Sequence, residues 1–330
     1  MSALGEFELI ERFFHRSDKT APGVALGIGD DCALLAPAAG QQLAVSSDML
    51  VEGRHFLSTV APDRLGHKAL AVNLSDLAAC GARPLAFTLA LALPRPDAAW
   101  LEGFARGLFA LADAHGCALV GGDTTAGPLN LCITVFGEVP PGQALRRSGA
   151  RVGDEVWVSG TPGEARLALE VFRGTLALPQ AAFDRVRARM EAPTPRVALG
   201  LALRGIASAC ADVSDGLAGD LGHILTASGV GACLDIPAAS LLLAQSDQLA
   251  LGYGEISAET RLECVFAGGD DYELVFTAPE SAHDAVLRAA ETAATPVTCI
   301  GRIEATPGLR LREHDGRVRP CPYGGFDHFG

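Results

Sequence analysis

Five short acidic turns constrain the fold of this chain, because each lies beside an apolar strand or at a strand-to-helix turn. They are Gly29-Asp30-Asp31, Ser46-Ser47-Asp48, Gly121-Gly122-Asp123, Asp212-Val213-Ser214-Asp215-Gly216 and Gly268-Gly269-Asp270-Asp271. One Asp-Gly turn alone is usually no more than a turn, since Asp bonds its own backbone and Gly adopts positive φ. Five of them at the ends of apolar strands predict that these strands converge in one sheet and gather their carboxylates.

Strand and helix alternate in both halves, which favours α/β or α+β layering over an all-β fold or a helical bundle. In the first half we predict helices over 6–14, 62–79 and 97–115, with Asp97 as an N-cap, and strands over 42–47, 84–93, 117–120 and 130–139. In the second half we predict strands over 153–160 and 274–277, helices over 163–172 and 196–205, and a strand-to-helix segment from 210 to 228.

The length of 330 residues favours two domains. Pro140, Pro141 and Gly142 interrupt the pattern before a new strand begins. We therefore predict an N-terminal sheet domain over 1–140 and a C-terminal α/β domain over 150–330.

Charge and composition narrow the classes of partner. The 26 Lys and Arg against 39 Asp and Glu give a net charge of −13, which disfavours nucleic acid and anionic membrane surfaces. The N-terminus shows no signal-peptide pattern, and no apolar run is long enough to span a membrane. The nine cysteines form no CxxC pair, which is typical of reduced thiols, so we expect a cytoplasmic protein.

Gathered carboxylates repel one another unless cations neutralise them. Oxygen ligands without Cys or His spacing favour Mg²⁺, which proteins hold with a few carboxylates and substrate phosphates. The neighbouring glycines let backbone N–H groups approach phosphate oxygens. This chemistry indicates phosphoryl transfer or an ATP-driven condensation. The sequence lacks a Walker loop, a complete GxGxxG fingerprint and the protein-kinase motifs.

Three further segments carry candidate residues. On the helix predicted over 62–79, Asn73 and Asp76 share a face and Lys68 lies two turns earlier. Because its neighbours are apolar, Asp76 is a candidate metal ligand. The alternative is that it belongs to a solvated polar stripe. His55 is either a substrate contact or an ordinary loop histidine. Arg147 is either a phosphate clamp or a solvated linker charge.

Ten sequence blocks, in order from residue 5 to residue 330, resemble those of the thiamine-monophosphate kinase family. They are GEFELI (5–10), GIGDDCALL (27–35), SSDMLVEGRHF (46–56), KALAVNLSDLAACGARP (68–84), GGDTT (121–125), RSGARVGD (147–154), SGTPG (159–163), DVSDGL (212–217), GGDDYEL (268–274) and the terminal GGFDHFG. Any single block is unspecific, whereas their combination is specific.

The resemblance implies ATP-dependent phosphorylation of thiamine monophosphate to thiamine diphosphate, in a two-domain fold shared with aminoimidazole ribonucleotide synthetase. By motif position it implies Mg²⁺ ligands at Asp31, Ser46, Ser47, Asp48, Asp76, Asp123, Asp212 and Asp215. It implies ATP contacts at Gly122, Asp123, Arg147 and Ser214, and thiamine-end contacts at His55, Asp270 and Phe326. Asp30 is expected to support Asp31, no covalent nucleophile is implied, and the family's N-terminal domain forms a homodimer through its sheet.

One block departs from the family pattern, since GGDDYEL stands where GGEDYEL is usual, so Asp270 is one methylene shorter. Two other readings remain open. Aminoimidazole ribonucleotide synthetase shares the fold, and a non-catalytic Mg²⁺ or nucleotide sensor would keep the acidic turns without needing Arg147 or the C-terminal aromatic.

Overall fold

The computed structural model describes residues 5–16, 21–247 and 256–326. The chain divides into two compact units. The first comprises Met1–Leu77 and Ala82–Gly142, and the second comprises Ala78–Gly81 and Gln143–Gly330. The last four residues of the GGFDHFG block lie outside the described residues.

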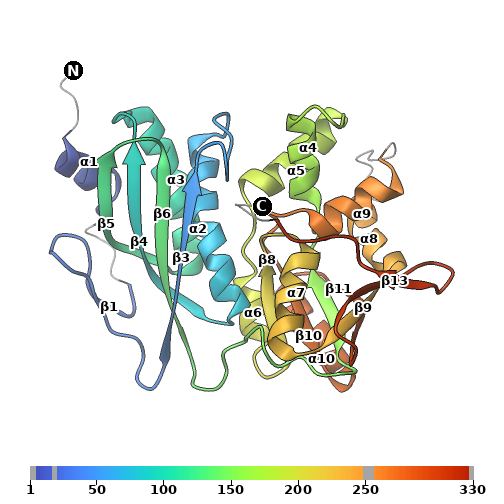
Figure 1. Ribbon diagram of the computed structural model, residues 1–330. Helices are drawn as coiled ribbons and strands as arrows, with labels where there is room; N and C mark the ends of the chain where they lie inside the picture. Colours follow the sequence, from blue (N-terminus) through green and yellow to red (C-terminus); the bar gives the residue numbers. More distant parts are fainter. Residues whose placement is uncertain (1–4, 17–20, 248–255, 327–330) are drawn as a thin grey trace. The chain divides into compact units, whose positions relative to one another are not determined.

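A four-stranded sheet in the order β3-β6-β4-β5 forms the first unit (Figure 1). β4 runs parallel to β5 and antiparallel to β6, which is antiparallel to β3. A short ribbon of β1 and β2 accompanies the sheet. The elements of this unit are α1 (Glu6–Phe13), β1 (Val24–Leu26), β2 (Leu34–Leu35), β3 (Gln42–Val51), α2 (Pro62–Ala79), β4 (Arg83–Leu93), α3 (Ala98–His115), β5 (Ala118–Ala126) and β6 (Asn130–Val139).

The two faces of this sheet differ. On β6 the alternating residues Leu131, Ile133 and Val135 are buried on the face that α2 and α3 cover (Figure 1). The opposite face is open at β3, where Leu43, Val45 and Met49 are exposed. An antiparallel strand pair with one covered face produces this alternation. Apolar side chains on the open face are the exception that calls for an explanation.

α2 and α3 approach each other closely enough to require glycine. A Cβ on Gly66 would lie 2.1 Å from the carbonyl oxygen of Phe104, and one on Gly107 would lie 1.8 Å from that of Asp63. The two backbones are therefore nearly in contact.

The second unit has a seven-stranded sheet in the order β13-β12-β9-β11-β7-β10-β8. Among the described strands of this sheet, β12 and β9 pair in parallel and the other neighbours pair antiparallel. Its strands are β7 (Glu155–Ser159), β8 (Ala209–Val213), β9 (Gly231–Asp235), β10 (Glu273–Ala278), β11 (Val297–Glu304), β12 (Gly308–Arg312) and β13 (Val318–Pro320). Its helices are α4 (Glu164–Phe172), α5 (Gln180–Glu191), α6 (Val197–Ala202), α7 (Leu217–Ser228), α8 (Ile236–Asp247), α9 (Ala258–Ala267), the 3₁₀ turn η1 (Glu280–Ala282) and α10 (His283–Thr292).

Both faces of the central strands in this unit are covered. Val156 and Val158 of β7 belong to the main core with Leu221 of α7, whereas Trp157 stacks on Phe276 on the other face. Every residue of β7, β8 and β10 is buried, as expected for strands between helical layers. The predicted layering of helices on sheets is confirmed in both units.

The structure confirms the predicted N-cap of α3 and contradicts the prediction that the five acidic turns converge in one sheet. Asp97 caps α3, its carboxylate accepting from the N–H groups of Ala99 and Trp100, as predicted. Convergence in one sheet is wrong, because three acidic turns belong to the first unit and two to the second. The GGDTT segment (121–125) lies within β5 rather than in a turn, since pairing with β4 continues through it.

No disulfide joins any of the nine cysteines, all of which lie in the described residues. Across the described ranges, no helix is long and apolar enough to cross a membrane.

Candidate functional site

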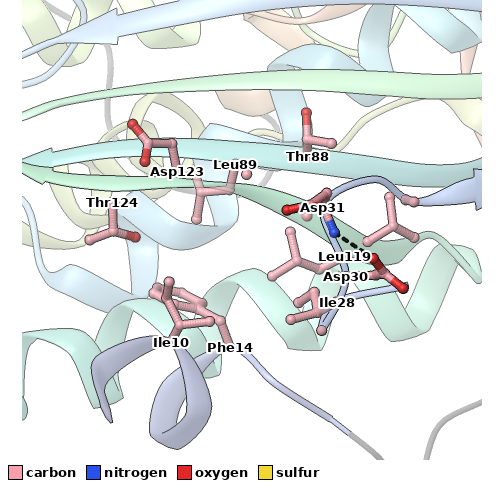
Figure 2. Close-up of a pocket in the computed structure, with 15 residues that line it drawn as sticks. Ile10, Phe14, Ile28, Asp30, Asp31, Thr88, Leu89, Leu119, Asp123 and Thr124 are labelled. Atoms are coloured by element: carbon pink, nitrogen blue, oxygen red, sulfur yellow. Dashed lines mark hydrogen bonds between the residues drawn. The ribbon is translucent and has the colours of Figure 1, made fainter. Parts of the chain in front are cut away.

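A pocket at the β5 edge of the first unit brings four predicted residues together (Figure 2). These are Asp30 and Asp31 from the loop before β2, and Gly122 and Asp123 from β5. The cavity has a volume of about 260 Å³. Its remaining lining is Ile10, Phe14, Ile28, Gly29, Ala33, Thr88, Leu89, Leu119, Val120, Gly121 and Thr124. The pocket thus combines carboxylates with an apolar wall.

Backbone geometry shapes both acidic segments of this pocket. Gly122 has φ +147°, and a Cβ there would lie 1.8 Å from the carbonyl oxygen of Leu89, so only glycine fits. In the loop, the Asp31 N–H donates to Oδ1 of Asp30 at 2.9 Å. Asp30 therefore contacts the backbone of Asp31, and its supporting role beside a metal ligand stays a prediction.

A second cluster joins β3 to α2. The Ser46 hydroxyl donates to Oδ2 of Asp76, and the Asp48 N–H donates to Oδ1 of Asn73 at 3.2 Å. Asn73 and Asp76 share one face of α2, as their spacing predicted, and the structure shows that this face contacts β3. Asp76 is half-buried against this strand, so it is not part of a solvated polar stripe.

Ser47 lies apart from its two neighbours. The acidic segment was predicted to end a strand, but β3 continues to Val51, so successive side chains alternate between faces. The Ser47 hydroxyl lies 3.0 Å from that of Thr134 on the face opposite Asp76. By strand register, Asp123 aligns with Ala90, Cys132 and Met49 on this same face. The structure thus does not bring the Ser47 side chain to Ser46 and Asp48.

His55 and Lys68 fix the turn after β3. The N–H of Val51 donates to Nδ1 of His55 at 3.0 Å, so the proton of the neutral ring resides on Nε2. Lys68, only 2% exposed, donates from Nζ to the His55 carbonyl at 3.1 Å. Both side chains contribute to the geometry of this turn.

The candidate metal ligands of the first unit are carboxylate and hydroxyl oxygens, which are the kind of ligand that Mg²⁺ prefers. Within the part of the chain that the structure describes, no three His, Cys, Asp or Glu side chains lie close enough to form a metal site. The type of these ligands fits Mg²⁺, whereas the described residues do not gather them into one site.

In the second unit, three segments carrying predicted residues meet. The turn after β8 contains Ser214 and Asp215, and its carbonyls accept from the N–H groups of Asp270 at 2.8 Å and Phe326 at 2.9 Å. Asp212 is buried on β8, where it pairs with Leu274. Phe326 is 57% exposed, so its ring is accessible to a ligand.

Arg147 lies in the exposed segment before β7. Its carbonyl accepts from the Ser228 hydroxyl at 3.2 Å, and the same hydroxyl accepts from the N–H groups of Gly149 and Ala150 at 3.1 Å each. Ser228, at the end of α7, therefore anchors the backbone that carries the Arg147 guanidinium.

Asp270 lies in a segment with positive φ angles, which hydrogen bonds to Asp271 hold on its C-terminal side. Asp270 and Tyr272 have φ of +71° and +52°, and the Tyr272 hydroxyl donates to Oδ1 of Asp270 at 3.1 Å. Asp271 accepts from the N–H groups of Gly163 at 2.7 Å and Ala165 at 3.3 Å, at the start of α4. Burial raises the pKa of Asp271 well above its usual range.

Glu273 and Asp220 are buried acids that the sequence did not single out. Burial raises the pKa of Asp220 to about 7, against the opposing effect of the backbone donors of Asp215 and Ser214. Burial also favours the neutral form of Glu273, but Arg196 and Arg189 outweigh it and lower its pKa. For Asp220 a signal existed, since it lies five residues after Asp215 in the first helical turn.

Two family models match most of the chain. They describe the N-terminal domain of AIR synthase related proteins over residues 29–139 and the corresponding C-terminal domain over residues 151–314. Solved structures of the hydrogenase maturation protein HypE, 18–20% identical with TM-scores of 0.72–0.74, share the fold.

Kinase relatives match over almost the whole chain. A thiamine-monophosphate kinase from Salmonella typhimurium is 46% identical, with 99% of each chain covered. The crystal structure of a thiamine-monophosphate kinase from Stenotrophomonas maltophilia is 45% identical, has a TM-score of 0.84 and covers 96% of this chain and 99% of the other. The structure of AaThiL complexed with AMPPCP and TMP is 28% identical, with a TM-score of 0.72 and 88% of each chain covered. The chain therefore belongs to the thiamine-monophosphate kinase family of enzymes, with the two-domain fold of AIR synthase related proteins.

Proposed function

We propose that this protein transfers the γ-phosphoryl group of ATP directly to thiamine monophosphate, forming thiamine diphosphate in a Mg²⁺-dependent reaction in the cytoplasm. The observation that carries the proposal is the pocket where Asp30, Asp31, Gly122 and Asp123 meet beside an apolar wall. Its relatives are kinases of this kind, and AaThiL binds AMPPCP and TMP.

Each residue set has a role in the proposal. Backbone N–H groups around Gly122, the hydroxyl of Ser214 and the guanidinium of Arg147 bind the triphosphate, since N–H and O–H donors and a planar guanidinium match phosphate oxygens. The Mg²⁺ ligands are Asp31, Ser46, Ser47, Asp48, Asp76, Asp123, Asp212 and Asp215, with Ser47 on a different face of β3 from Ser46 and Asp48. Bound Mg²⁺ would neutralise the charge on the transferred phosphoryl group.

The thiamine end requires an anion and an aromatic face. Asp270 supplies a carboxylate and Phe326 an accessible ring, and a cationic thiazolium is attracted by both. His55 is held by its Nδ1 contact with Val51, which leaves the proton on Nε2 as the donor toward substrate. These three residues bind and orient the acceptor.

No side chain is required as a nucleophile, because thiamine monophosphate supplies an ionised phosphate oxygen. This oxygen attacks the γ-phosphorus while the bond to the ADP oxygen breaks, and ADP leaves with the electron pair. The chain's contribution is alignment and charge neutralisation. Unphosphorylated thiamine should therefore be a very poor acceptor.

The direct test combines product analysis with stereochemistry. The purified protein, ATP, Mg²⁺ and thiamine monophosphate should yield thiamine diphosphate, and chiral γ-thiophosphate should be transferred with inversion. Retention would indicate a phospho-enzyme and contradict direct transfer. ATP binding without product formation would favour a sensor, and turnover of a ribonucleotide substrate in place of thiamine monophosphate would favour the synthetase.

We further propose a homodimer through the open face of the first unit's sheet, where Leu43, Val45 and Met49 are exposed. A second copy would remove this apolar surface from water. Light scattering at micromolar protein should give a dimer mass. Val45→Lys should give a monomer, whereas Leu287→Lys, at an exposed apolar position on α10, should not. A monomeric wild-type protein would contradict the proposal.

A further inference from the structure

Asp220 is a buried acid on α7 that the proposed reaction does not use. It is 1% exposed, although it lies in the first turn of a helix whose preceding residue, Gly216, has no side chain to cap it. Its Oδ2 accepts from the N–H groups of Ser214 and Asp215, each at 3.0 Å. One oxygen therefore holds both donors of the turn assigned above to nucleotide and metal.

The acceptors of the same turn hold two other segments. The carbonyl of Ser214 accepts from the Asp270 N–H at 2.8 Å, and the carbonyl of Asp215 accepts from the Phe326 N–H at 2.9 Å. Asp270 and Phe326 are the two residues of this unit proposed to bind the thiamine end. The turn is thus bonded to Asp220 on one side and to the substrate segments on the other.

Two glycines, Gly269 and Gly219, allow the backbones of these segments to pack in direct contact. A Cβ on Gly269 would lie 2.5 Å from the carbonyl oxygen of Ser214, and one on Gly219 would lie 2.5 Å from Cα of Gly325. Backbones in such contact transmit a displacement instead of absorbing it. A shift of the Ser214–Asp215 turn must therefore shift the segments of Asp270 and Phe326.

We propose that Asp220 is a positioning residue: its carboxylate fixes the Ser214–Asp215 turn and, through the carbonyls of that turn, sets Asp270 and Phe326 in place for the acceptor. This inference rests on the proposed function for its substrate assignment. It predicts that losing one acceptor atom weakens the binding of thiamine monophosphate as well as that of ATP.

Asp220→Ala and Asp220→Asn separate this role from general stability. Alanine leaves two buried N–H groups without an acceptor, which corresponds to about a tenfold or larger increase in local opening. Amide exchange should accelerate at Ser214 and Asp215 and also at Asp270 and Phe326, with KM for both substrates raised about fivefold or more. Asparagine retains an acceptor oxygen and should restore most of both properties.

Asp154→Ala is the matched control. Asp154 is also buried, and its Oδ2 accepts from the Arg151 N–H at 2.9 Å and from the Ser208 hydroxyl. Since Ser208 precedes β8 and Ser214 follows it, this carboxylate acts at the other end of the strand. Asp154→Ala should lower stability without changing either KM or the exchange of the Phe326 amide.

Gly219→Ala tests the linkage with Asp220 intact, and remains informative if Asp220→Ala does not fold. Alanine is the better helix former, so α7 should form, but its Cβ must displace Gly325. Exchange at Phe326 and KM for thiamine monophosphate should rise. Gly222→Ala, on the same helix with no atom within 4 Å of the new Cβ, should change neither.

Two results would overturn the inference: an unchanged KM for thiamine monophosphate in Asp220→Ala and Gly219→Ala, or faster exchange confined to α7. If the wild-type protein formed no thiamine diphosphate, the proposed function would fail. Amide exchange at Asp270 and Phe326 would still decide whether Asp220 positions them.

Discussion

Replacing Glu273 by Gln should test how strongly a buried charge cluster stabilises the second unit. The Glu273 side chain is 0% exposed and accepts from the Ser159 hydroxyl at 2.6 Å, from Arg189 Nη2 at 2.5 Å and from Arg196 Nε and Nη2 at 2.6 Å each. Glutamine preserves the shape but removes the charge. Both guanidinium groups, with side chains 17% and 14% exposed, would then face a neutral amide.

Removing one partner of a buried ion pair costs about 3–5 kcal/mol. Arg189 would keep a second acid, since its Nε lies 3.6 Å from Oε2 of Glu164, so the lower part of this range applies. We expect the free energy of unfolding to fall by about 3–4 kcal/mol. For a unit of this size, the corresponding decrease in Tm is about 6–16 °C.

Urea unfolding at pH 7 in a Trp100→Phe background would measure this change, because Trp157, buried on β7, then reports on the second unit. Glu263→Gln is the control: this side chain is 55% exposed and its Oε1 lies 3.7 Å from Arg166, so its loss should change stability by less than about 0.5 kcal/mol.

The pH dependence has a definite sign. The pKa of Glu273 is lowered in the folded state, so its stabilising contribution is present above the ordinary glutamate value of 4.5 and is lost as the pH falls through the folded pKa. The difference between wild type and Glu273→Gln should therefore shrink below that value. A difference under about 1 kcal/mol at pH 7 would refute the reasoning.

Three further substitutions test the first unit. Asp76→Asn should abolish Mg²⁺-supported turnover, measured as initial rate against Mg²⁺ concentration, without unfolding the protein. Asp63→Asn, on the same helix, should leave this turnover unchanged. Near-normal activity of Asp76→Asn at low Mg²⁺ would contradict the ligand assignment. Gly122→Ala should lower the free energy of unfolding by more than about 2 kcal/mol and weaken ATP binding in calorimetry, because φ is +147° there. Gly121→Ala, whose new Cβ has its nearest neighbour at 3.9 Å, should unfold like wild type. Asp97→Ala should cost about 1 kcal/mol in urea unfolding by removing the cap of α3, with kcat unchanged.

Features encoded locally could be predicted from the sequence. α3 begins at Ala98 because Asp97 binds the N–H groups of the first turn, and this depends on a few neighbouring residues. That Asn73 and Asp76 share one face of α2 likewise follows from helical spacing. Such predictions need no knowledge of what the helix packs against.

Features that depend on distant partners could not be predicted. The polar segment from Ser46 to Asp48 does not look like strand interior, yet pairing with β6 extends β3 through it and separates Ser47 from its neighbours. In the sequence, Asp220 cannot be distinguished from an ordinary helical acid. In the fold, its carboxylate accepts a hydrogen bond from the Ser214 N–H. The sequence therefore indicated candidate residues, and the structure was needed to group them.

The left-handed backbone at Asp270 determines which side chains this position accommodates without strain. Aspartate and asparagine enter this conformation several times more readily than longer side chains do, because a short polar group can bond locally. With φ at +71°, an aspartate at this position costs the loop less conformational free energy than a longer side chain would. The backbone conformation at residue 270 therefore restricts which side chains fit there, independently of what the carboxylate contacts.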